Sequence, residues 1–90
     1  MREAELQKKI VDRLNRHGWS CIKLIQTNMN GIPDLLCIRK GKVMFLEVKT
    51  EKGVVAPLKE KRIADLNKHG IFSRVVRSLE DIDIYRYKGI

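Results

Sequence analysis

Residues 31–50 read GIPDLLCIRKGKVMFLEVKT, two apolar runs separated by a Lys-Gly pair at positions 40–41. If that pair forms a two-residue hairpin turn, counting outward along both strands places Asp34 directly opposite Glu47. Side chains alternate along a strand, so Glu47 and Lys49 lie on the same face of the sheet. The hairpin therefore predicts two carboxylates and one ammonium group on one patch.

Two opposed carboxylates need a positive partner, because like charges directly across a strand pair are destabilising. A divalent cation suits Asp34 and Glu47, with the Val48 carbonyl and water as further oxygen ligands. One such water, made more acidic by the cation, could attack a phosphodiester. Lys49 could orient that water or stabilise the developing charge on the phosphate.

The alternative for these charges is an ion pair of Lys49 with either acid on a solvated face. The apolar runs at 35–38 and 43–46 weigh against it, because they predict a sheet largely covered on both faces. Charges in such a setting need a functional reason.

The rest of the chain predicts one α/β domain over residues 1–90, in the order α-β-β-β-α-β-α. Apolar periodicity and capping signals indicate helices over 2–17 and from Pro57 to about 69. A short last helix opens at Ser78, with Asp81 three residues on completing a capping box. The predicted strands are 19–26, 34–39, 42–49 and 71–77. The hairpin makes the first strands antiparallel, and the second helix can cross over to the fourth strand. A mixed sheet flanked by helices follows.

Composition indicates a polyanionic partner. The chain has 90 residues, 19 Lys and Arg against 11 Asp and Glu, and a net charge of +8. Nucleic acid fits this charge better than a membrane surface, and no membrane partner or small-molecule substrate is expected. The chain is small for a stable core, so a homodimer is plausible. A charged start without an apolar leader, together with Cys21 and Cys37 as free thiols, favours the cytoplasm.

Two helical positions extend the predicted site. Glu3 lies on the apolar stripe of the first helix, where it could reach the patch of Asp34 and bind a second metal or a water. Alternatively, it sits in a frayed first turn that the helix dipole favours. Lys59 lies on the inner stripe of the next helix, where it could contact a phosphate or extend to solvent.

Several polar residues could contact a nucleic-acid backbone. Asn30 and Gly31 lie in a loop that precedes Asp34, although ordinary turn chemistry explains them equally well. Basic side chains elsewhere, among them Arg77, would add contacts to phosphate that do not depend on sequence. The candidates for nucleic-acid binding are Lys59, Arg62, Lys52, Asn30 and Gly31.

Pro33-Asp34 followed by Glu47-Val48-Lys49 resembles the PD-(D/E)xK nuclease motif. The element order resembles the restriction-endonuclease-like core of that superfamily. More narrowly, GIPDLL, FLEVKT, a helix led by Pro-Leu and the closing RVVRSLEDI resemble the virus-type replication-repair nuclease (VRR-NUC) domain. The likeness covers nearly the whole chain.

The resemblance implies hydrolysis of DNA phosphodiesters with Mg²⁺ or Mn²⁺. Asp34 and Glu47 would be metal ligands, Lys49 the catalytic lysine and Glu3 the acid of the first helix. Free-standing members resemble Holliday-junction resolvases, act as homodimers and occur in phages, so this chain would work in a bacterial cell or, as a phage protein, in the host cytoplasm. The family usually carries Gln where this chain has Lys59.

The leading hypothesis is therefore a metal-dependent endonuclease selective for branched DNA such as the Holliday junction. A basic DNA-binding module or accessory subunit without catalysis is the alternative from another class. The complete set of two acids and a lysine weighs against that alternative. A sequence-specific restriction-type nuclease fits less well, because 90 residues leave little room for a base-reading insertion.

Overall fold

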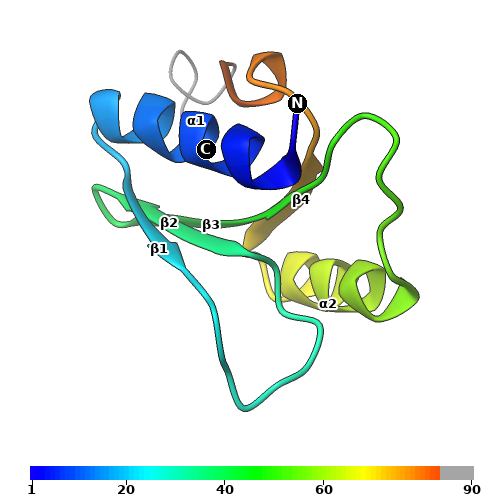
Figure 1. The fold of residues 1–90 in the computed structure, drawn as a ribbon. Coiled ribbons are helices and arrows are strands. Elements are labelled where there is room, and N and C mark those ends of the chain that lie inside the picture. Colours follow the sequence, from blue (N-terminus) through cyan, green and yellow to red (C-terminus); the bar gives the residue numbers. More distant parts are fainter. Residues whose placement is uncertain (84–90) are drawn as a thin grey trace.

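A four-stranded mixed sheet organises the chain, for which a computed structural model describes residues 1–83. The elements are α1 (Glu3–Arg16), β1 (Ser20–Lys23), β2 (Leu35–Arg39), β3 (Lys42–Val48), α2 (Pro57–Lys68) and β4 (Phe72–Val76). A helical turn at 80–83 completes the predicted order, and the predicted fold class is confirmed. In Figure 1, α1 and this last turn lie on one side of the sheet, and α2 lies on the other.

The strands follow the order β1-β2-β3-β4, with antiparallel pairs except for the parallel pair of β3 and β4. The hairpin register is confirmed, because Arg39 pairs with Lys42 and Leu35 with Leu46. Lys40 and Gly41 have φ angles of 47° and 80°, and a two-residue turn of this kind needs positive φ at both positions. Lys40 therefore adopts a conformation that is uncommon for a residue with a side chain.

The main core lies between α1 and the sheet. The predicted stripe of Leu6, Ile10 and Leu14 is buried. On β3, Met44 and Leu46 are also buried in the same cluster. Because α1 presents this stripe to the sheet, its first turn is held over the end of β3, where the predicted site lies (Figure 1).

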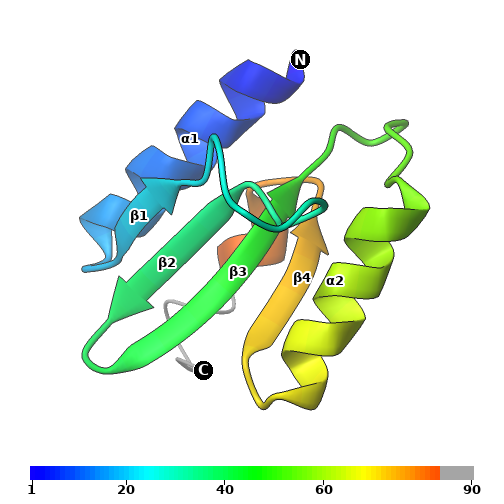
Figure 2. The ribbon, with the colours of Figure 1, turned by 90° about the horizontal axis from the view of Figure 1, so that it is seen from below.

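The other face of β1–β3 is open, so the prediction of a sheet largely covered on both faces is wrong. Ile22 and Ile38 on this face are 47% and 37% exposed, and Leu36, Val43 and Phe45 are only partly buried. Figure 2, which views this side, shows α2 alongside β4 and no helix over β1–β3. The cause is geometric, because one crossover helix packed against β4 is too narrow to cover four strands. Consistent with this position, α2 has no fully buried residue, including its predicted inner stripe.

The first strand is shorter than the predicted 19–26. It ends at Lys23, and the chain leaves the sheet so that Ile25 is 91% exposed. The second strand likewise begins at Leu35, one residue after its predicted start at Asp34. Cys21 pairs with Cys37 across β1 and β2, and both are free thiols.

The last helical turn begins with half of the predicted capping box. The Asp81 N–H donates to the Ser78 hydroxyl at 3.3 Å, but the Asp81 carboxylate accepts the Arg77 N–H at 2.7 Å.

Among the described residues, no helix is long and apolar enough to cross a membrane.

Candidate active site

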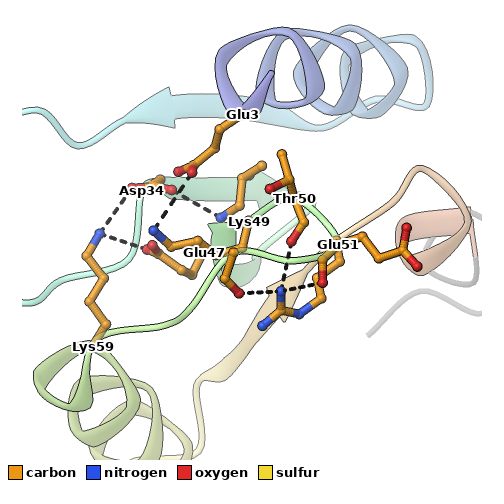
Figure 3. Close-up of polar contacts among 10 residues, drawn as sticks. Glu3, Asp34, Glu47, Lys49, Thr50, Glu51 and Lys59 are labelled. Atoms are coloured by element: carbon orange, nitrogen blue, oxygen red, sulfur yellow. Dashed lines mark hydrogen bonds and ion pairs between the residues drawn. The ribbon is translucent and has the colours of Figure 1, made fainter. Parts of the chain in front are cut away.

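Asp34 and Glu47 converge where the loop before β2 meets the end of β3 (Figure 3). Asp34 stands just before β2, and its Oδ2 accepts the Val48 N–H at 3.1 Å. That hydrogen bond anchors one carboxylate oxygen to the strand that carries Glu47. Glu47 is only 1% exposed, on the opposite face from the buried side chain of Val48. The hairpin and this hydrogen bond thus hold the two carboxylates close to each other.

The Lys59 ammonium lies between the two acids. Its Nζ is 3.1 Å from Asp34 Oδ1 and 2.9 Å from Glu47 Oε1. Of the two sequence alternatives for Lys59, extension to solvent is wrong, because its ammonium points at the two carboxylates, and the phosphate contact stays a prediction. Its side chain is 28% exposed and serves as the counter-ion of both carboxylates. The positive partner that the hairpin predicts is therefore supplied by α2.

The pKa values of this triad follow from burial and charge. Burial raises the pKa of Glu47, and the nearby Asp34 charge acts in the same direction, against the opposing effect of Lys59. Burial works against the charge of Lys59, but hydrogen bonds to Glu47 and Asp34 leave the pKa of Lys59 raised overall. The ammonium therefore stays charged at neutral pH.

A second ion pair adjoins the first, between Lys49 and Glu3. Lys49 Nζ is 3.8 Å from Glu3 Oε2, and Figure 3 shows the Glu3 side chain reaching from α1 toward the group of charges. The sequence prediction that Glu3 reaches this patch therefore agrees with the geometry. The loop residue Gly53 leaves room for the lysine stem, since a Cβ there would lie 3.3 Å from Lys49 Cδ.

The donor set suits a small hard cation that keeps most of its water. Among residues 1–83, no group of three or more His, Cys, Asp or Glu side chains could hold a metal ion. Asp34 and Glu47 still share one cation, the Lys59 ammonium, and Mg²⁺ is commonly bound through one or two carboxylates plus substrate phosphates. The residues present fit such an ion. The roles assigned to Glu3 and to the Val48 carbonyl stay predictions.

Arg77 is a structural residue of the site that sequence reasoning counted only as a phosphate contact. Its Nη1 donates to the carbonyl oxygens of Thr50 at 2.8 Å, Glu51 at 3.3 Å and Gly53 at 2.7 Å. It thereby holds the loop that follows Lys49. Nothing in the local sequence marks this role, because the partners are backbone groups 24 to 27 residues earlier.

The predicted nucleic-acid contacts divide into two groups. Arg62 is structural, because its Nε donates to the Asn30 carbonyl at 2.8 Å and fastens the loop before β2 to α2. Asn30 and Lys52 have exposed side chains. A groove of about 360 Å³ runs beside the acids, and its lining includes Asn30, Gly31, Asp34 and Lys59. Of the two acids, Asp34 lines this groove and Glu47 does not.

The loop of Gly31 packs so closely against α2 that a side chain at position 31 should destabilise the protein. Its φ is +82°, and a Cβ would lie 2.7 Å from Leu58 Cγ and 3.1 Å from the Leu58 carbonyl oxygen. Gly31→Ala should lower the free energy of unfolding by about 2–4 kcal/mol, from left-handed strain plus overpacking. The measurement is urea unfolding.

Gly41→Ala is the matched control for that substitution. Gly41 has a φ of +80° but no heavy atom within 4 Å of the added Cβ. Its loss of stability should be limited to the left-handed strain, about 1–2 kcal/mol. Equal losses in the two variants would show that the contact with α2 contributes nothing.

Two comparisons with known proteins found a match. The sequence profile of the family described as "VRR-NUC domain" matches residues 1–80. A solved structure described as "VRR_NUC domain" is 29% identical, with a TM-score of 0.84, and the match covers 98% of this chain and 97% of that one. No curated protein matches the chain. With its family profile matched over almost its whole length, this chain belongs to the VRR-NUC family of nuclease-type domains, whose substrate is DNA.

Proposed function

We propose that this chain is a Mg²⁺- or Mn²⁺-dependent endonuclease that hydrolyses phosphodiester bonds in branched DNA such as the Holliday junction. The observation that carries the proposal is the convergence of Asp34 and Glu47 on one cationic group, with Lys49 beside them. We place the activity in a single domain and in the cytoplasm of a bacterial cell, whether the chain is a cellular or a phage protein.

Each residue of the cluster has a distinct task in this reaction. A cation held by Asp34 and Glu47 would supply Lewis acidity at the scissile phosphate. Asp34 keeps its orientation through the Val48 N–H, so the ligand is preorganised. Lys49 orients the attacking water or stabilises the charge that develops on the phosphate. Glu3, whose Oε2 lies 3.8 Å from Lys49 Nζ, orients the Lys49 ammonium.

A charge surplus of +8 supports DNA as the partner, because Lys and Arg contacts to phosphate supply affinity that does not depend on sequence. The groove beside Asp34 and Lys59 brings the backbone to the acids. Selectivity for branched DNA rests on the family resemblance.

The homodimer is part of the same proposal, and the open face of β1–β3 is where we place the second copy. This face is an uncharged surface on a strongly basic chain, and it is formed by Ile22, Leu36, Ile38, Val43 and Phe45. Two copies that both carry +8 repel each other elsewhere, so an apolar face is the surface on which they can meet. A dimer would also present two cutting sites to paired strands.

The solution mass tests this dimer. The unaltered chain should sediment as a dimer, and Ile38→Lys should shift it to a monomer, because a buried ammonium without a partner is costly. Lys42→Glu, an exposed change at the hairpin end, should leave the mass unchanged. A monomer at micromolar concentration in the unaltered chain would contradict the proposal.

Cleavage of labelled DNA tests the activity. Junction, flap, splayed and linear substrates should be compared with Mg²⁺, with Mn²⁺ and with a chelator, and Asp34→Ala serves as the inactive control. We expect cleavage of branched substrates that the chelator abolishes. Equal cleavage by Asp34→Ala would exclude this site as the source of the activity.

One observation favours a second candidate, a DNA-binding module without catalysis. Lys59 already neutralises the acids that would otherwise hold a cation. If the pure protein shifts branched DNA in a gel but never cuts it with either metal, this second function is correct.

A further inference from the structure

The five charged side chains at the site leave little demand for an added cation. Glu3, Asp34 and Glu47 contribute three negative charges, and Lys49 and Lys59 contribute two positive ones. The Lys59 ammonium touches both carboxylates at 3.1 and 2.9 Å, in the space that a cation shared by them would need. A divalent ion shared by Asp34 Oδ1 and Glu47 Oε1 would have to take the place of this ammonium.

We propose that Lys59 is an internal competitor for the metal, so that a divalent cation binds only when this ammonium leaves Asp34 and Glu47. The inference rests on the proposed function, since it concerns the same cation site. In the metal-free protein, Lys59 keeps the buried Glu47 carboxylate neutralised and the two acids together. The cost of breaking its contacts is subtracted from the affinity for the metal.

The groove beside the acids gives the released ammonium a destination. Asp34 and Lys59 line it together with the loop of residues 24–32, and Asp34 is the only acidic residue in that lining. A lysine side chain that swings out of the carboxylate pair therefore enters space where an anionic group is its best available partner. A DNA backbone phosphate has that chemistry, so metal and DNA would together release Lys59.

This coupling distinguishes Lys59 from a purely structural lysine. An ammonium that only holds the fold would stay on the acids when metal and substrate bind. A competitor instead makes metal affinity depend on its own charge, and makes metal binding easier when a phosphate is present to receive it. The charge at position 59, and not the size of the side chain, should set the metal affinity.

Calorimetric titration of Mn²⁺ into the chain without DNA is the primary test. Lys59→Met keeps an unbranched stem but removes the charge, and it should lower the dissociation constant for Mn²⁺ by about tenfold or more, or about 1.4 kcal/mol. Lys59→Arg keeps the charge and should bind as weakly as the unaltered chain. Lys61→Met removes an exposed charge from the same helix and should also match the unaltered chain.

A second measurement uses the unaltered protein and stays informative if Lys59→Met does not fold. The ammonium signal of Lys59 in nitrogen-15 NMR should be slow in hydrogen exchange without metal, because two carboxylates hold it. Saturating Mg²⁺ should shift this signal or remove it by fast exchange. An unchanged signal at saturation would overturn the proposal.

The outcomes separate this inference from the proposed function. If the unaltered chain and Lys59→Met bind Mn²⁺ with equal affinity, Lys59 is no competitor, while the metal-dependent nuclease stands. If neither binds Mn²⁺ at millimolar concentration and DNA is cut in chelator, both the inference and the proposed metal dependence fail.

Discussion

Lys49→Met should lower the single-turnover rate of DNA cleavage by about 10²–10³-fold, the typical loss when one group that stabilises transition-state charge is removed. The Lys49 side chain is 23% exposed, and its ion pair with Glu3 is long at 3.8 Å. Such a pair contributes little to stability, so the variant should fold and bind DNA. A single-turnover assay at saturating protein separates this effect on chemistry from any effect on binding.

Lys42→Met is the matched control for that experiment. Lys42 is an exposed lysine at the opposite end of β3, so its loss lowers the net charge equally without touching the site. Its single-turnover rate should equal that of the unaltered chain. An equal loss in both variants would mean that overall charge, and not the place of Lys49, governs the rate.

Removing the Lys59 charge should destabilise the metal-free protein. Lys59→Met leaves Glu47, 1% exposed, without its counter-ion. We expect a loss of roughly 1–3 kcal/mol in the free energy of unfolding, measured by urea unfolding with chelator. Burial already raises the pKa of Glu47. Below that pKa the carboxyl carries its proton and needs no counter-ion, so the loss of Lys59 costs little. The loss of stability should therefore grow as the pH rises through the pKa of Glu47.

A double-mutant cycle identifies the cause of that loss. Glu47→Gln in the Lys59→Met background removes the unpaired charge and should recover much of the stability, because a neutral amide is less costly to bury. If the two substitutions are strictly additive, the ammonium and the carboxylate do not interact energetically. Added Mn²⁺ should stabilise Lys59→Met more than the unaltered chain, since the metal replaces the missing charge.

Much of the site could be predicted from the hairpin. The Lys-Gly turn sets the register, and the register brings Asp34 and Glu47 together. Both steps depend on residues close in sequence and on the alternation of side chains along a strand. The inward stripe of α1 similarly predicts that Glu3 points toward the site, where it meets Lys49.

The sequence predictions were wrong or incomplete where contacts join segments that are far apart in the chain. The apolar runs in β2 and β3 predict a sheet covered on both faces, but coverage depends on where α2 packs, and α2 lies alongside β4. In the same way, the positive charge of Arg77 predicts a contact with phosphate, but its guanidinium donates hydrogen bonds to carbonyl oxygens of a distant loop. A helical wheel also places Lys59 on an inner stripe without showing what it will meet.

The sequence alone determined the family, through the resemblance of its motifs. It also determined the order of elements and the pair of acids with their lysine, because these follow from spacing, periodicity and turn chemistry along short segments. Only the tertiary structure decided that Lys59 is the cation between the acids, since that contact joins α2 to two strands across 12 and 25 residues of chain. The tertiary structure also decided that one face of β1–β3 is open, because α2 packs alongside β4. Long-range packing selects the partner of a buried charge, and no local pattern records it.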